Sequence, residues 1–313
     1  MPDKLNLVGK LSFFLGASEE DIKTSANSMS RKYKQYKIPK KNGGSRTILH
    51  PCRPLKALQY AIHEVLLNKL EVHPIAHAYV PNQKSPLKQS AKAHTNYKYT
   101  IRIDFENFFP SIRPEDLELQ INKNFILSKT DKYLLRTVLF YQKNRGSRPI
   151  LPIGAPTSPT ISNIVMFNLD ELLLKTSKEH DRDSALTRYA DDIYFSTNIK
   201  GCCKLFYDEI FQLLKRIDSP RLKINTNKTL FLSKGTKRVV NGLFVTPNGK
   251  VSIGRKRKTQ IKSLIYKHSQ TALMGKELLQ TRGLLAFIQD CEPEFYNTLA
   301  LKYGVHFYSI KES

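Results

Sequence analysis

The stretch LTRYADDIYFS, residues 186–196, places two adjacent carboxylates at the centre of a run of strand-forming residues. Asp191 and Asp192 suit the turn of a β-hairpin, because Asp is an ordinary turn residue. Two neighbouring negative charges repel each other, however, and an Asn-Gly turn would avoid that cost. The stretch therefore predicts an antiparallel hairpin whose turn binds a cation, and the fold must accommodate both.

A second strand also ends in a carboxylate, within YTIRIDFENFFPSI, residues 99–112. Ile101 and Ile103 alternate with polar residues as in a half-buried strand, and the strand ends at Asp104 before a proline stops the next element. Alone, Asp104 could simply cap a helical turn. Together with the hairpin it predicts two neighbouring strand ends that carry carboxylates.

Two such strand ends suit one chemistry, the transfer of a nucleotide. That reaction uses two divalent ions roughly 4 Å apart, one activating the attacking 3′ hydroxyl and one neutralising the pyrophosphate that leaves. Mg²⁺ prefers oxygen ligands and needs only a few carboxylates besides substrate phosphates. We expect Asp104 and Asp191 to bridge two Mg²⁺ ions, which Mn²⁺ can replace, with Asp192 beside them.

The charge distribution points to a polyanionic partner. The 313 residues include 51 Lys and Arg against 27 Asp and Glu, a formal net charge of +24. Residues 22–63 and 219–276 contain no acid, whereas residues 104–218 hold 16 of the 27 acidic residues. Basic runs of this length repel themselves unless an anion binds them. Two basic arms that hold nucleic-acid phosphates, around a metal-binding centre, are the arrangement we expect.

The chain length predicts two or three subdomains of one compact unit. The four cysteines show no C-x-x-C spacing, and no window approaches 18 apolar residues. These features favour a cytoplasmic protein with neither structural zinc nor a membrane span. A helix is predicted over 18–32, a hairpin around 42–44 and a helix with a buried apolar face over 55–71.

Several segments in order resemble the motifs of reverse transcriptases. IDFENFFPSI and RYADD resemble the two catalytic motifs, and GAPTSPTISNIVM resembles the motif that positions template and nucleotide. LKINTNKT is similar to the lysine-bearing motif of the palm, and IPKKNGGSRTI to the hairpin of the fingers. The resemblance, over about residues 33–254, implies an α+β right-hand polymerase fold. Its expected parts are an N-terminal segment with fingers over 1–98, a palm with an antiparallel catalytic sheet over 99–254, and a helical thumb over 255–313.

Within that family the chain is most similar to bacterial retron reverse transcriptases. SAKAH, residues 90–94, resembles the retron N-A-x-x-H element, and VNG, residues 240–242, stands where retrons usually show V-T-G. Both elements depart from the pattern, since Ser90 replaces Asn and Asn241 replaces Thr. Ile153 also replaces the usual Gln, so we expect no polar contact from this position to the nucleotide.

The resemblance also implies which residues meet the nucleotide. Lys41 and Arg46 would contact the triphosphate, and Lys228 would protonate the leaving pyrophosphate. Phe109 would lie under the sugar and exclude a 2′ hydroxyl, although either Phe108 or Phe109 must belong to the core. The remaining residues predicted to bind nucleotide are Phe105, Gly154, Ala155 and Pro156.

The same resemblance implies RNA-directed DNA synthesis from deoxynucleotides on a structured noncoding RNA of the msr-msd type. The product would be a branched RNA–DNA (msDNA) that works with an effector protein encoded nearby in defence against phage. Two alternatives stay open: another bacterial reverse transcriptase related to group II introns, and an RNA-binding protein that keeps the polymerase fold without activity. The residues predicted to bind RNA are Ser90, His94, Arg255, Lys256, Arg257 and Lys258.

Overall fold

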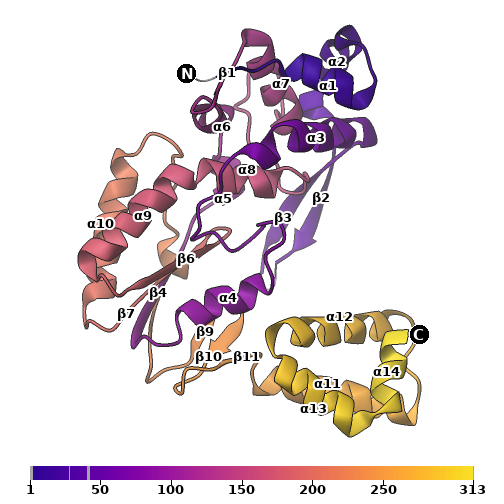
Figure 1. Ribbon diagram of the computed structural model, residues 1–313, viewed down its shortest axis with the longest axis vertical. Helices are drawn as coiled ribbons and strands as arrows, with labels where there is room; N and C mark the ends of the chain where they lie inside the picture. Colours follow the sequence, from indigo (N-terminus) through magenta and orange to yellow (C-terminus); the bar gives the residue numbers. More distant parts are fainter. Residues whose placement is uncertain (1–2, 28, 41–42, 313) are drawn as a thin grey trace.

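The computed structural model describes residues 3–27, 29–40 and 43–312. A four-stranded antiparallel sheet lies between the helices of the first half of the chain and a helical unit formed by residues 255–312 (Figure 1). The expected combination of helices with an antiparallel sheet is therefore present.

The central sheet contains both predicted carboxylate strands. Its order is β6-β7-β4-β8, with every neighbouring pair antiparallel. The strands are β4 (Tyr99–Asp104), β6 (Ala185–Tyr189), β7 (Asp192–Thr197) and β8 (Leu230–Ser233). The register places Asp104 directly opposite Asp192. The predicted strand and hairpin are confirmed, and they are neighbours.

One face of this sheet is apolar and covered by two helices, α9 (Phe167–His180) and α10 (Cys202–Arg216) (Figure 1). The ring of Phe195 on β7 stacks on Phe206 of α10, with centroids 4.2 Å apart. The sheet residues buried on this face include Ile101, Ile103, Ile193 and Phe195. Burial of this apolar area favours folding by about 25 cal/mol per Å².

The opposite face is polar, because side chains alternate along a strand. Helix α4 (Pro86–Ala93) packs on this side against β6 and against β10 (Leu243–Val245). His94, which follows α4, lies 2.8 Å from the hydroxyls of both Ser196 and Thr187. Strand β10 belongs to a three-stranded sheet with β9 (Arg238–Val240) and β11 (Val251–Ser252). Asp104 and Asp192 therefore share their face with a buried polar cluster.

The N-terminal part consists of helices around a long hairpin. The elements are β1 (Asp3–Lys4), α1 (Leu7–Leu15), α2 (Glu19–Ala26), β2 (Tyr33–Pro39), β3 (Ser45–Pro51) and α3 (Arg53–Val65), with 3-10 turns at Met29–Arg31 and Leu67–Lys69. Ser18 caps α2, but this helix and α3 are shorter than predicted, because 3-10 turns replace their last residues. The predicted hairpin is confirmed, with β2 and β3 paired from Tyr33 and Pro51 to Pro39 and Ser45.

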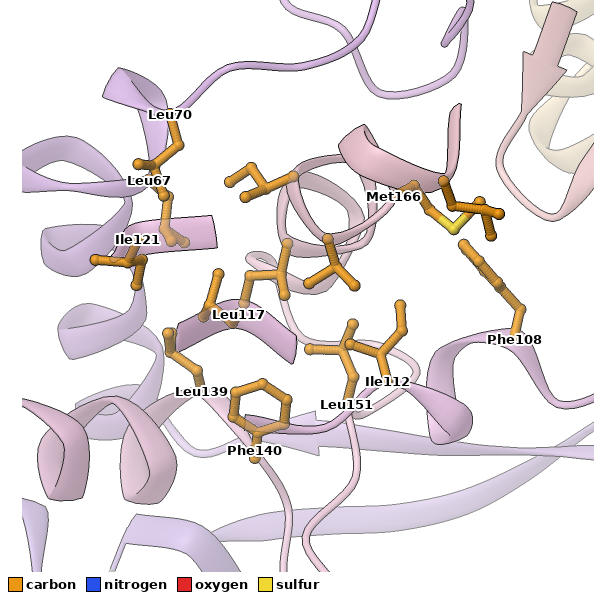
Figure 2. Packing of buried hydrophobic residues seen from close by; sticks show 14 of the residues in the cluster. Leu67, Leu70, Phe108, Ile112, Leu117, Ile121, Leu139, Phe140, Leu151 and Met166 are labelled. Atoms are coloured by element: carbon orange, nitrogen blue, oxygen red, sulfur yellow. The ribbon is translucent and has the colours of Figure 1, made fainter. Parts of the chain in front are cut away.

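The middle of the chain adds a core that anchors the segment after Asp104. Its elements are α5 (Phe108–Ser111), α6 (Pro114–Ile121), β5 (Phe125–Ile126), α7 (Lys129–Leu139) and α8 (Ser158–Val165). Figure 2 shows side chains from several of these elements packed together. Phe108, Ile112, Leu117 and Leu151 are all at most 3% exposed. The close packing fixes the chain just beyond β4.

Residues 255–312 are helical throughout most of their length, as the sequence predicts. The helices are α11 (Arg255–Gln270), α12 (Gly275–Cys291), α13 (Pro293–Tyr303) and α14 (Val305–Glu312). Their core contains Ile261, Leu285 and Phe307 and continues into the β9–β10 hairpin through Val240 and Leu243. Among the described residues, no helix has the length and apolarity needed to cross a membrane.

A buried ion pair joins β6 to α9. Arg188 and Asp170 are both 0% exposed, and the guanidinium donates two hydrogen bonds, of 2.8 and 2.6 Å, to the carboxylate. A third donor group, Nη1, reaches the side chain of Asn163 at 3.0 Å and the carbonyl of Ala190 at 3.1 Å. The pair therefore fixes the turn that carries Asp191.

We expect Asp170→Asn to lower the free energy of unfolding by about 3–5 kcal/mol, because it leaves the charge of Arg188 buried without a counter-charge. Urea denaturation measures this. Asp208→Asn is the matched control, since Asp208 pairs with Lys204 on an exposed helix surface and such pairs contribute about 0–1 kcal/mol. Equal losses in the two variants would contradict the role given to the buried pair.

Candidate active site

The structure brings the three predicted aspartates together at one end of the central sheet. Asp104 ends β4, Asp192 begins β7 opposite it, and Asp191 lies in the β6–β7 turn. Ala190 in this turn has φ of 56°, an unusual value for a residue with a side chain. Its carbonyl accepts a hydrogen bond from Arg188, which helps to hold the strained turn.

Two basic side chains neutralise part of this charge. Lys228, in the 3-10 turn Thr226–Lys228, places Nζ at 3.0 and 3.2 Å from the two carboxylate oxygens of Asp104. Arg102 donates to both oxygens of Asp192, at 2.9 and 3.0 Å. Sequence reasoning did not predict Arg102. A signal existed, because Arg102 precedes Asp104 by two residues and must share its face of the strand.

Burial and mutual repulsion disfavour the charged forms of Asp191 and Asp192. Burial raises the pKa of Asp192 to about 6, while Arg102 opposes the rise and the charge of Asp191 adds to it. Burial also raises the pKa of Asp191, and the charge of Asp104 adds to that rise. A cation bound between these groups would relieve the repulsion.

The donor set fits Mg²⁺ in its chemistry. Buried carboxylate oxygens are the ligands that this ion prefers, and Lys228 already holds a positive charge against Asp104. In the part of the chain that the structure describes, no three His, Cys, Asp or Glu side chains form a ready-made metal site. Mg²⁺ bound by few carboxylates and completed by substrate phosphates requires no such site.

A cleft of about 490 Å³ opens beside Asp191, between the central sheet and the β2–β3 hairpin. Five residues predicted from sequence line it: Arg46, Phe105, Phe109, Asp191 and Lys228. Lys41 lies outside the described residues, but Lys40 and Lys143 are also on the wall of the cleft. The other lining residues include Gln35, Ser45, Thr47, Tyr79, Asn107, Tyr141 and Ile153.

The phenylalanines near Asp104 divide into core and cleft residues. Phe108 is 3% exposed and belongs to the core, while Phe109 is partly exposed at the cleft. Phe105 also borders the cleft, but its ring is 2% exposed and stacks near Phe108, with centroids 6.0 Å apart. The ring of Phe105 is therefore largely a core group, and Phe109 remains the candidate for contact with a sugar.

The small residues at 154–156 have a packing role that the sequence did not reveal. Gly154 has φ of 114°, and a Cβ there would lie 2.7 Å from Ile48 Cγ2 and 3.0 Å from the carbonyl oxygen of Leu49. The neighbouring Ile153 carbonyl accepts a hydrogen bond of 2.8 Å from Leu49. Ala155 is 4% exposed and Pro156 partly buried. In this structure the segment supports β3, and Ile153 lines the cleft.

Ser90 and His94 do not fit the prediction that they bind RNA. Both are 0% exposed, and their side chains are hydrogen-bonded within the protein, to Thr187 and Ser196 among others. Burial lowers the pKa of His94 to about 3, so its ring is neutral. Neither side chain can reach RNA in this structure. The sequence of residues 90–94 does not indicate which face of the helix is buried, and the prediction of RNA contacts depended on that.

The four predicted basic residues at the start of α11 have different environments. Arg255 and Lys256 are exposed to solvent. Arg257 donates a hydrogen bond of 3.2 Å to the carbonyl of Gly242, and Lys258 pairs with Glu292. Arg255 and Lys256 are thus the two that are best placed for phosphate contacts.

Comparisons with known proteins agree with this arrangement. Residues 38–268 match the family described as "Reverse transcriptase (RNA-dependent DNA polymerase)". The retron Ec83 reverse transcriptase of Escherichia coli is 38% identical over 275 residues, which cover 87% of each chain. The retron Ec73 reverse transcriptase of the same species is 36% identical over 279 residues, 86% of each chain.

Solved structures support the fold. Telomerase from Candida albicans, in complex with a fragment of telomeric RNA, aligns with 92% of this chain at a TM-score of 0.51 and 13% identity. Apo telomerase from Candida tropicalis aligns with 88% at a TM-score of 0.51 and 14% identity. The chain spans about three fifths of those two chains, 60% and 58%. The predicted right-hand polymerase fold is thereby confirmed, and the chain belongs to the reverse transcriptase family and, within it, to the retron reverse transcriptases of bacteria.

Proposed function

We propose that this RNA-directed DNA polymerase copies part of its own structured noncoding RNA, of the msr-msd type, into a branched RNA–DNA molecule. The chemical part of the proposal rests on one observation, the meeting of Asp104 and Asp191 beside a cleft that also presents Arg46 and Lys228. Carboxylates and cations face each other there, as a metal-bound triphosphate requires.

The residues of the cleft have separate tasks. Asp104 and Asp191 would hold Mg²⁺, with Asp192 beside them, and the bound ions would activate the 3′ hydroxyl and neutralise the leaving pyrophosphate. Arg46 extends from the exposed β3 edge and binds triphosphate oxygens through its planar fork. Lys228 lines the cleft with its Nζ 3.0 Å from Asp104, and it would donate its proton to the leaving pyrophosphate after exchanging Asp104 for substrate.

The same placement supports our assignment of fingers, palm and thumb. The β2–β3 hairpin over the cleft acts as fingers, within residues 1–98, and the four-stranded sheet is the palm, within 99–254. The helical unit beginning at residue 255 serves as the thumb. Arg255 and Lys256 at its start contact RNA phosphates, and the net charge of +24 supplies a general attraction to the polyanion.

The branched product, in our proposal, acts in the cytoplasm with an effector protein encoded nearby in defence against phage. The similarity to retron enzymes over 86–87% of their length favours a retron over a group II intron relative. A non-catalytic RNA-binding protein is disfavoured by the three aspartates, because buried carboxylates that serve no ion are costly to keep.

Asp104→Asn or Asp191→Asn should lower DNA synthesis by several orders of magnitude, because each removes a charge that holds Mg²⁺. Primer extension by purified protein on an artificial RNA template measures this. Asp208→Asn removes an exposed charge on α10 and should leave the rate unchanged. Activity of the Asp104 or Asp191 variants close to that of the Asp208 variant would exclude the two-metal assignment.

Phe109→Ala should increase ribonucleotide incorporation relative to deoxynucleotide, because the ring that would clash with a 2′ hydroxyl is gone. Single-nucleotide insertion with paired deoxy- and ribonucleotides gives the ratio. Phe13→Ala is a suitable control, since Phe13 is 93% exposed on α1. An unchanged ratio of ribonucleotide to deoxynucleotide insertion in the Phe109 variant would show that this residue only packs against its neighbours.

The protein, expressed with its neighbouring locus, should copurify with one defined RNA, and its DNA should stay joined to that RNA after protein is removed. Debranching enzyme should release the DNA, because we expect a 2′–5′ phosphodiester at a guanosine. Binding should weaken with salt, with a slope of about −0.7 per phosphate neutralised on single strands. DNA with a free 5′ end, made equally well on unrelated RNAs, would leave a reverse transcriptase but argue against the retron product.

A further inference from the structure

A partly buried hydrogen bond joins the two segments that resemble retron signatures. Asn241, in the turn between β9 and β10, donates from Nδ2 to Ser90 Oγ on α4 at 2.8 Å. Ser90 is 0% exposed, and its hydroxyl also lies 3.0 Å from Thr187 Oγ1 on β6. The two segments are 151 residues apart in the chain. One amide and one hydroxyl therefore connect a helix, a hairpin turn and the catalytic sheet.

The same turn is attached to the catalytic strand. The backbone N–H of Asn241 donates to Tyr194 Oη at 3.1 Å. Tyr194 follows Asp192 by two residues on β7 and is paired across the sheet with Arg102. Arg102 in turn holds the Asp192 carboxylate through two hydrogen bonds. The turn is thus bonded to the strand that begins with Asp192, and the Arg102 that holds this carboxylate lies opposite the bonded tyrosine.

The turn and the carboxylate also border one space. A cleft of about 370 Å³ is lined by Arg102, Asp192, Tyr194, Asn241 and Gly242 together with residues of β8 and β9. It lies beside Asp192, whereas the cleft assigned to the nucleotide lies beside Asp191. A shift of the turn would change the walls around Asp192 and leave Arg46 and Phe109 in place.

The backbone of the turn restricts what residue 241 can be. Asn241 and Gly242 have φ of 51° and 79°, and Val240 pairs with Leu243 on either side of them. A two-residue hairpin loop with two positive φ values favours Asn-Gly. This preference explains why Asn occupies position 241 but not why its side chain bonds to Ser90. Its Oδ1 atom is buried without a hydrogen-bond partner.

We propose that Ser90 and Asn241 form one positioning pair, in which an amide on one side and a hydroxyl on the other set the distance between α4 and the turn. The activity part of this inference rests on the proposed polymerase function. The pair accounts for both departures from the retron pattern, Ser90 for Asn and Asn241 for Thr, together. In this chain the amide is on the turn and the hydroxyl on the helix, the reverse of that pattern.

Size and burial explain why the two positions must change together. If both positions carried serine, the two hydroxyls could not reach each other across the distance that the Asn241 amide now spans. Each hydroxyl would then lose a hydrogen-bond partner in the interior. Two amides would overfill a position that is fully buried at Ser90. An exchange of the two side chains restores one amide and one hydroxyl.

The test compares Ser90→Asn, Asn241→Ser and the double variant that carries both. Each single variant should lower kcat for single-nucleotide addition about tenfold with an unchanged nucleotide KM, because the nucleotide cleft is separate. The double variant should return to within about twofold of the original rate. In urea unfolding both single variants should be destabilised, and the exchange should lose less stability than the two single losses added together. Serine at the positive φ of position 241 keeps part of the loss. Circular dichroism at the assay temperature checks that each variant is folded.

Ser90→Ala, Asn241→Gly and their combination form a second cycle if a swapped single variant does not fold. Glycine keeps the positive φ and removes the side-chain bond at a modest cost in backbone entropy. The double variant should therefore be no worse than the more strongly impaired single variant. Asn248→Gly is the control for a turn asparagine, because Asn248 is exposed between β10 and β11.

Two results would overturn the inference that Ser90 and Asn241 act as a pair. One is additive effects of the single variants on both kcat and unfolding, and the other is a double variant no better than the worse single variant. An original protein that folds but extends no primer would overturn the proposed polymerase function instead. In that case the unfolding measurements still decide whether the two side chains act together.

Discussion

The guanidinium of Arg188 brings a full positive charge into the interior, and Asp170 is the group that neutralises it. A buried charge without its partner costs several kcal/mol, so β6 and α9 must stay together for the protein to remain folded. Because the same guanidinium also binds the Ala190 carbonyl, this constraint extends to the strained turn that presents Asp191. A contact that could be read as ordinary stability therefore also holds a site carboxylate in place.

The alternation of the central strands then separates packing from chemistry. Ile103 and its neighbours on one face pack under α9 and α10, which leaves Arg102 and Asp104 on the other face. That second face is also buried, yet its groups are polar and hydrogen-bonded, as His94 shows with Ser196. A hydrogen-bonded polar layer resists small shifts, because movement would break bonds of buried donors and acceptors. Such rigidity suits a site in which carboxylates must keep fixed separations.

Much of this architecture could be predicted from local pattern. The strand ending at Asp104 and the hairpin around Asp191 follow from periodicity and turn chemistry, and the structure has both. The helices after residue 255, also present, are expected only from the resemblance to reverse transcriptases. The partners of charged groups could not be predicted, because they depend on which distant segments meet. Lys228 on Asp104 joins residues 124 positions apart. Ser90 and His94 failed as predicted RNA contacts for a related reason, since burial is a property of the whole fold and not of a five-residue motif.

A motif that is characteristic of an RNA-copying family can therefore consist of residues that contact each other inside the protein and not the RNA. Ser90 and Asn241 lie in two signature segments, yet the bond they make is to each other. Specific recognition by neighbouring surfaces depends on where the helix and the turn are held, so a buried contact can influence it without touching the ligand. In the proposed function, the exposed basic residues of the two acid-free arms, Arg255 and Lys256 among them, supply attraction to RNA without specificity. Charge on the surface and fixed geometry beneath it are separate requirements, and this chain assigns them to different residues.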